Sequence, residues 1–120
     1  MEHLFLMNSN LHLTVKDIIG SEIAVTTDDG NILYENINKA FLKDDTVELD
    51  FAGIKILITA FLNSAIGRLY ENYDSKFLNE NLKLINVAPE DRILFKKVVE
   101  RAQEYFNDKK GFEDSANNAF

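Results

Sequence analysis

Hydrophobic and polar residues alternate along the start of the chain. Residues 4–7 are apolar, residues 8–10 are the turn-forming Asn, Ser and Asn, and hydrophobic residues occupy every second position over 11–15. Alternation with a period of two on either side of a turn is typical of a β-hairpin. We therefore predict a hairpin over residues 4–15, followed by a break at Gly20.

The next segment has the spacing of an amphipathic helix. Four apolar residues between 33 and 41 recur every three or four positions, with polar residues between them, which places them on one face of a helix. Thr27 or Asp28 is expected to cap this helix, because hydroxyl and carboxylate side chains satisfy the free N–H groups of the first turn. The polar residues 43–45 are expected to end it.

A strand and a second helix follow. Residues 46–51 alternate with a period of two and predict a short β-strand. The apolar, β-branched run 54–58 is either a buried strand or a packed loop, and periodicity alone does not decide between them. Apolar positions then repeat every three or four residues over 60–73 and predict a helix, with Thr59 at the position of its N-cap.

The last third of the chain predicts one more strand and one more helix. Residues 76–81 are mostly polar and are interpreted as a connection to a strand over 82–87. Pro89 suits the first turn of the last helix, because its missing N–H needs no partner there. The buried stripe of this helix is expected to end near Asn107.

Strands and helices alternate after the hairpin, which argues for a mixed sheet. We predict a single α/β domain over residues 1–110. Its small mixed sheet is expected to contain the N-terminal hairpin plus two or three further strands, covered mainly on one face by about three helices. Residues 111–120 are polar and rich in small residues, and they are expected to form a flexible C-terminal tail.

Length and charge limit the classes of function. The chain has 120 residues, which fits one domain, and a net charge of −7. This charge repels nucleic-acid phosphates and anionic lipids, so we expect neither nucleic-acid nor membrane binding. Cys is absent, which suits a reducing cytoplasm. The sequence shows no signal peptide and no apolar run near the roughly 20 residues of a membrane helix. A cytoplasmic location is therefore expected.

Side chains with ordinary catalytic chemistry are scarce. The two histidines, His3 and His12, are interpreted as solvated surface residues, and no Cys is available as a nucleophile or metal ligand. The five Gly residues are scattered and form no phosphate-binding loop. We therefore expect no metal, no cofactor and no catalytic residue, and we do not expect an enzyme.

Most acidic residues fall in predicted turns and helix caps, but Asp50 does not. It lies near the end of a predicted strand, just before Gly53, where the loops of α/β sheets carry function. One interpretation is a turn-forming residue that accepts backbone N–H groups. The other is an acid/base group that works with Glu48, which shares its side of the strand, or with Asp45.

Thr59 is the second residue with two interpretations. A hydroxyl at a helix N-terminus is first a cap, which contributes about 1 kcal/mol. A phosphoryl group at the same place is stabilised by free N–H groups and adds about two negative charges, which would switch a docking surface. Asn63 and Ser64, one turn later, either line the same surface or are simply solvated.

The segments 47–54 and 59–63 together resemble the STAS-like domain family of unknown function, DUF4325, and the resemblance extends over roughly residues 11–107. That family is similar to the STAS domains, which include anti-sigma factor antagonists. In those proteins a kinase phosphorylates a serine or threonine before a helix, and Thr59 occupies the corresponding position. Family members tend to occur beside or fused to histidine-kinase-like ATPase domains, which implies a partner of that type.

The resemblance implies a single-domain STAS-like fold and a regulatory protein–protein interaction module, switched by phosphorylation of Thr59. The partner-binding residues expected from it are Asp50, Gly53, Thr59, Phe61, Asn63 and Ser64. Two alternatives stay open at this point. One is a small acid/base enzyme that uses Asp50, and the other is a structural or homo-oligomeric module, such as a homodimer paired through strand edges.

Overall fold

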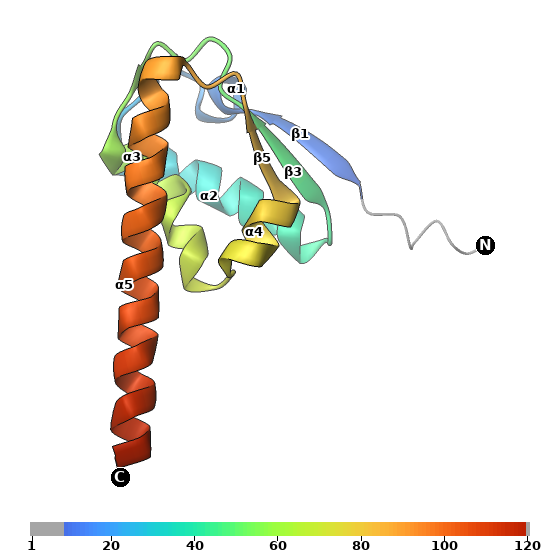
Figure 1. Ribbon diagram of the computed structural model, residues 1–120. Helices are drawn as coiled ribbons and strands as arrows, with labels where there is room; N and C mark the ends of the chain where they lie inside the picture. Colours follow the sequence, from blue (N-terminus) through green and yellow to red (C-terminus); the bar gives the residue numbers. More distant parts are fainter. Residues whose placement is uncertain (1–8, 120) are drawn as a thin grey trace, which may run out of the picture.

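The computed structural model describes the backbone of residues 9–119 and the side chains of residues 9–106. Five strands, five α-helices and two short 3-10 helices occur in this part of the chain (Figure 1). In chain order they are β1 (Asn10–Thr14), α1 (Val15–Ile19), β2 (Ile23–Ala24), α2 (Thr27–Leu42), β3 (Thr46–Asp50), β4 (Ile56–Leu57), α3 (Thr59–Ala65), η2 (Gly67–Glu71), α4 (Ser75–Asn81), β5 (Leu82–Ile85), η3 (Pro89–Asp91) and α5 (Arg92–Ala119).

The strands form two separate parallel sheets. β1, β3 and β5 make a three-stranded sheet in the order β1-β3-β5, and β2 pairs with β4. Every strand pairing among the described residues is parallel, so the prediction of a mixed sheet is wrong for this part of the chain. The first strand of the predicted hairpin, residues 4–7, lies outside the described residues. Its second strand is β1, whose described neighbour is β3.

The connections between paired strands explain this topology. Parallel neighbours need a crossover of a dozen or more residues, usually through a helix. α2 lies between β1 and β3, and α3, η2 and α4 lie between β3 and β5. The predicted alternation of strands and helices is confirmed for β3, β5, α2, α3 and α5, but a period-two pattern does not reveal which strand is the neighbour.

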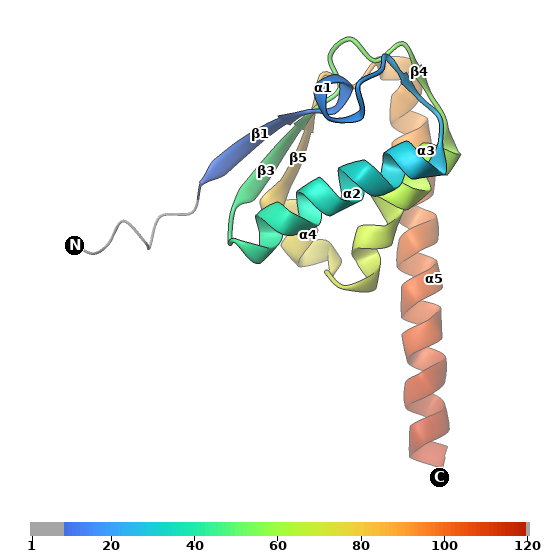
Figure 2. The same ribbon diagram turned by 180° about the vertical axis from the view of Figure 1, so that it is seen from behind.

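The core lies between one face of the three-stranded sheet and the helices. α2 presents Leu33, Ile37 and Phe41 to it, and all three are buried together with Val47 and Leu49 of β3. α2 packs along α3, and α5 packs against α3 and η2 at the side away from the sheet (Figures 1 and 2). The helical face predicted from the spacing of apolar residues in 33–41 is therefore the buried face.

The opposite face of the three-stranded sheet is polar. His12 and Glu48 project from this face, because they alternate with the buried residues of their strands. Lys83 lies beside Glu48 in the register and is exposed. Most parallel sheets are covered on both faces, so a parallel sheet with one polar face open to solvent is unusual.

Several short elements differ from the sequence predictions. α1 and β2 were not predicted, and the polar connection expected at 76–81 is a helix, α4. The helix predicted over 60–73 ends at Ala65 and continues as the 3-10 helix η2. The run 54–58 contains a strand of only two residues, β4. α5 passes the expected end at Asn107 and continues to Ala119, and the division of the chain near residue 110 stays a prediction.

Candidate docking face

Asp50 ends β3 and is nearly buried, with 12% of its side chain exposed. Three donors surround its carboxylate. The backbone N–H of Ala52 and the side-chain amide of Asn86 each donate to Oδ1 at 2.9 Å, and Nε2 of His12 lies 2.9 Å from Oδ2. Glu48 Oε1 lies 3.9 Å from Nδ1 of the same His12. Asp50 therefore links all three strands of the larger sheet, through the middle of β1, the end of β3 and the residue that follows β5.

These contacts set the charge state of Asp50. The hydrogen bond from the Asn86 amide, followed by the one from the Ala52 N–H, lowers the pKa of Asp50 below its usual value, and His12 adds to this effect. Partial burial acts in the opposite direction but does not prevail. A carboxylate with both oxygens engaged is an acceptor that fixes the turn after β3, which is the turn-forming interpretation of this residue.

Gly53 follows in the same turn and has a φ of 82°. A left-handed backbone of this kind is strained for residues with a side chain. A Cβ added at this position would also lie 3.1 Å from Cδ of Lys16. Gly53 is thus required by the path of the chain between β3 and β4, and it contributes no side chain for a partner to bind.

The start of α3 is presented at the surface. Ile58 is the N-cap of this helix, and its side chain makes no capping hydrogen bond. Thr59 is the first helical residue and is half-buried, so the expectation that Thr59 itself is the cap is wrong. Ala60 and Asn63 are exposed, whereas Phe61 is fully buried. Phe61, which was expected to bind a partner, belongs to the core beneath the surface.

Ser64 holds α3 against α2. Its hydroxyl lies 3.2 Å from the carbonyl oxygen of Thr27 and 3.1 Å from that of Phe61. The two helices approach so closely here that a Cβ at Gly30 would lie 1.8 Å from Oγ of Ser64 and 2.6 Å from the carbonyl oxygen of Phe61. Ser64 is therefore a packing residue of the α2–α3 contact, although part of it reaches the surface beside Asn63.

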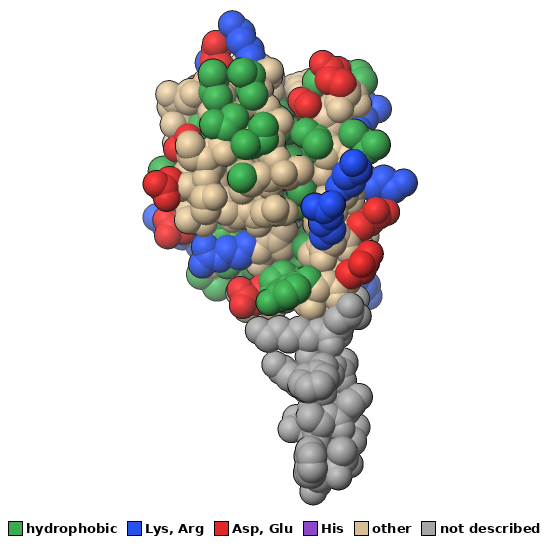
Figure 3. Space-filling view, turned by 90° about the vertical axis from the view of Figure 1, so that its left-hand side faces the viewer, with side chains coloured by type: hydrophobic (Ala, Val, Ile, Leu, Met, Phe, Trp, Pro, Cys, Tyr) green, Lys and Arg blue, Asp and Glu red, His purple; other side chains and the backbone are tan. Residues whose placement is uncertain are grey.

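Three isoleucines project outward next to the start of α3. Ile23 of β2 lies opposite Ile56 of β4 in the parallel register, and Ile58 follows on the same side of the strand as Ile56. Their exposed fractions are 43%, 48% and 42%. We call these three residues the isoleucine patch. Figure 3 shows hydrophobic side chains gathered on the upper part of the face that carries β4, α3 and α5.

A groove of about 650 Å³ continues this face between α3, η2 and α5. Small residues such as Ala60 and Ala102 line it, and Tyr105 lies among the other lining residues. The two charged residues that line it, Arg68 and Arg101, are both basic although the chain is acidic overall. We use the name docking face for the isoleucine patch, the exposed residues of α3 and this groove.

Arg68 is held in place on the groove. Its guanidinium lies 4.1 Å from the centre of the Tyr34 ring and donates to Oδ1 of Asn31 at 3.4 Å. Within residues 9–106, neither Arg68 nor Arg101 forms a salt bridge. A guanidinium carries five N–H donors, so each of these groups can bind a carboxylate of another molecule.

Part of this face cannot be found from local sequence patterns. Ile23 and Arg101 carried no local signal, because only the pairing of β2 with β4 and the packing of α5 bring them beside α3. Ile56 and Ile58 offered a weak signal, since they alternate with the buried Leu57 in a run that was treated as uniformly apolar. Asn63 and Thr59, named from the sequence, do lie at the surface of the face.

Two other kinds of site were compared with the described part of the chain, a membrane span and a metal site. No helix among the described residues is both long enough and apolar enough to cross a lipid bilayer. The same residues contain no cluster of three or more His, Asp or Glu side chains arranged to hold a metal ion.

The comparisons with known proteins give one result. The model of a family described as STAS-like domain of unknown function (DUF4325) matches residues 29–92, which is more than half of the chain. This range runs from the first turn of α2 to the first residue of α5 and includes β3, β4, α3 and β5. Searches of curated proteins and of solved structures gave no match.

Proposed function

Because this chain belongs to the family of STAS-like domains of unknown function (DUF4325), we propose that it is a regulatory module that binds another protein through the docking face. The observation that carries the proposal is the isoleucine patch. Three large apolar side chains are kept at the surface next to the exposed start of α3. Contiguous exposed apolar residues mark interaction surfaces on soluble proteins.

The physical gain from docking lies in covering these side chains. Fully burying an isoleucine contributes about 1.5–3 kcal/mol, and each residue of the patch still exposes somewhat less than half of its surface. Together the three side chains contribute a few kcal/mol to association. Arg68 and Arg101 add contacts for carboxylates at the rim of the groove, which favours a partner with acidic residues there.

The partner that fits the resemblance to STAS domains is a histidine-kinase-like ATPase or a kinase. Thr59 is the hydroxyl best placed for a switch, because it lies between the exposed residues Ile58 and Ala60. A phosphoryl group on Thr59 adds about 1.5–2 negative charges beside the isoleucine patch. Burying a charged phosphoryl group in an apolar interface requires removing its hydration water, which costs free energy. Phosphorylation of Thr59 is therefore expected to release the partner.

Calorimetric titration of the full chain with a histidine-kinase-like ATPase domain, the partner class proposed above, tests the docking. Ile56→Asp is expected to weaken binding at least tenfold. Ile32→Asp is the matched control, because Ile32 is 43% exposed on α2 and lies outside the docking face. Equal losses from the two variants would show that the patch has no special role, and saturable binding unaffected by either would place the interface elsewhere.

The switch has a separate test. The chain is incubated with the same ATPase and ATP, and phosphorylated residues are located by mass spectrometry, with Thr59→Ala as the control. Phosphate on Thr59 that is lost in the variant supports the switch. Phosphate confined to other residues, or none, removes Thr59 from the proposal while leaving docking to be decided by the titration.

A further inference from the structure

β5 is an edge strand of the three-stranded sheet within the described residues, because β3 is its only neighbour there. The carbonyl oxygen of Ile85 accepts from the N–H of Phe51 at 3.0 Å, so Ile85 directs its backbone groups toward β3. Successive residues of a strand direct these groups to opposite sides. The N–H and C=O of Leu84 therefore point to the outer edge, where another strand can pair with them.

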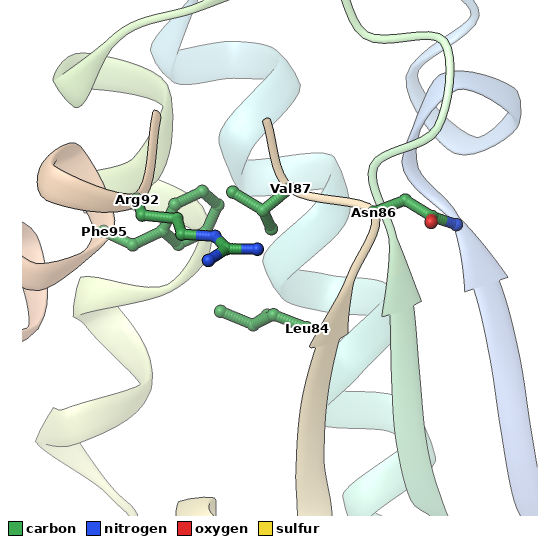
Figure 4. A pocket seen from close by; sticks show the side chains of 5 residues that line it. All are labelled: Leu84, Asn86, Val87, Arg92 and Phe95. Carbon is green, nitrogen blue, oxygen red and sulfur yellow. The ribbon is translucent and has the colours of Figure 1, made fainter. Parts of the chain in front are cut away.

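A pocket of about 560 Å³ lies beside this edge. Leu84, Val87 and Phe95 supply its apolar lining, and Leu84 is 36% exposed although its register partner Leu49 is fully buried. Figure 4 shows the Leu84 side chain extending away from β3 on the side where Phe95 and Val87 lie, whereas Asn86 points in the opposite direction. The pocket thus provides an apolar site immediately next to an unpaired strand edge.

Arg92 is the charged residue of this pocket. It lines the pocket together with Val87 and Phe95, and Figure 4 shows its side chain extending from α5 toward β5. Within residues 9–106, no carboxylate forms a salt bridge with Arg92. A guanidinium beside an apolar pocket matches a ligand that carries both an apolar group and a carboxylate.

We propose that the outer edge of β5 and the adjacent pocket lined by Arg92 bind an extended segment of another protein. The segment adds a strand to β5, places an apolar side chain between Leu84 and Phe95, and presents an acidic side chain to Arg92. In strand addition, backbone hydrogen bonds supply affinity and pockets for alternate side chains supply specificity. This β5 edge site is distinct from the docking face and does not depend on the function proposed above.

The observations favour an acidic peptide over a second copy of the chain. Two β5 edges paired about a two-fold axis near Leu84 would bring the two Arg92 side chains toward each other, and like charges in such a contact oppose association. A helical ligand would leave the outward backbone groups of Leu84 without strand partners. An extended acidic segment satisfies the backbone groups, the pocket and the cation together.

A library of random octapeptides displayed on phage and selected on the full chain tests the site. We expect enriched peptides to combine alternating apolar residues with at least one Asp or Glu. Binding of a synthetic enriched peptide is then measured by fluorescence anisotropy. Arg92→Glu is expected to weaken it at least tenfold, whereas Lys97→Glu, an equal charge change on α5 outside the pocket, leaves it within about twofold.

Two further measurements keep the test independent of folding and of the docking face. Circular dichroism establishes that Arg92→Glu is folded, and hydrogen exchange is expected to slow at the amide of Leu84 when the peptide binds. Ile56→Asp is expected to leave peptide binding unchanged. Selection without enrichment, enriched peptides insensitive to Arg92→Glu, or no added protection of Leu84 would each overturn the β5 edge site.

Discussion

The two sheets of this domain differ in the polarity of the residues that they expose to solvent. The three-stranded sheet presents polar residues to solvent, including His12 and Glu48, and buries its apolar residues under the helices. The two-stranded sheet presents Ile23 and Ile56. A polar open face is what a sheet needs in water, whereas an apolar one is expected to be covered by something else. The contrast separates residues that stabilise the domain from residues that are available to a partner.

The largest expected effect comes from the inner side of α3. Phe61→Ala should lower the free energy of unfolding by about 3–5 kcal/mol, because Phe61 is fully buried and its removal leaves a cavity. Urea denaturation followed by circular dichroism measures this. If the free energy of unfolding changed by less than about 1 kcal/mol and partner binding were lost, Phe61 would be a partner-binding residue and not a core residue.

Two neighbouring residues of β4 differ in how much of their surface is exposed. Leu57 is 7% exposed and Ile56 is 48% exposed. Leu57→Ala should therefore destabilise the domain by about 2–5 kcal/mol, whereas Ile56→Thr should change stability by less than about 0.5 kcal/mol. Thermal denaturation of the two variants side by side is the measurement. Equal losses would mean that both residues serve the core and that the isoleucine patch has been misinterpreted.

The polar face predicts a smaller effect that depends on pH. Asp50→Ala should cost about 1–3 kcal/mol at neutral pH, because it leaves the Asn86 amide and the Ala52 N–H without their acceptor. The folded protein lowers the pKa of Asp50, so the stabilisation is complete above the pKa of an unfolded aspartate, about 3.9, and is lost as the pH falls through the lower folded value.

Urea denaturation near pH 7 and again at about pH 2.5 tests this sign. The difference between the wild type and Asp50→Ala should shrink at acid pH. Glu48→Ala serves as the control, because Glu48 is 33% exposed and lies 3.9 Å from His12, a pair expected to contribute less than about 1 kcal/mol. A difference that grows on acidification would contradict the assignment of Asp50 as a charged acceptor.

The smallest effect is expected at Thr59. Since Ile58 occupies the N-cap position of α3, Thr59→Ala should change the free energy of unfolding by less than about 0.5 kcal/mol, instead of the loss of about 1 kcal/mol expected for a cap. Asp74→Ala is the matched control, because Asp74 does cap α4 through the N–H of Phe77 at 2.8 Å. Equal losses from both would restore the capping role of Thr59.

The parts of the fold that the sequence predicted are those with strong periodicity. The apolar spacing of α2 and the alternation in β3 each identified the buried residues, because a helix or strand covered on one side must repeat its apolar positions. α4 was missed, since it carries only Phe77 and Leu78 as apolar residues. Its capping residue, Asp74, was an available signal.

The candidate sites depend on contacts that no local pattern records. His12 and Asn86 contact Asp50 across 38 and 36 positions of the chain, and they meet only because β1, β3 and β5 are neighbours in one parallel sheet. The pairing of Ile23 with Ile56 likewise depends on crossovers. Strand order and helix packing are tertiary properties, so the charged and exposed apolar residues they assemble could not be found from periodicity alone.

The close approach of α2 and α3 has a consequence for how a partner is recognised. With Gly30 against Ser64, and the Ser64 hydroxyl near carbonyl oxygens of both helices, the two helices are expected to move as one rigid unit. A rigid surface loses little conformational entropy when it is gripped. The domain would then present a preorganised surface. In any complex, the free-energy cost of conformational change would come mainly from the partner.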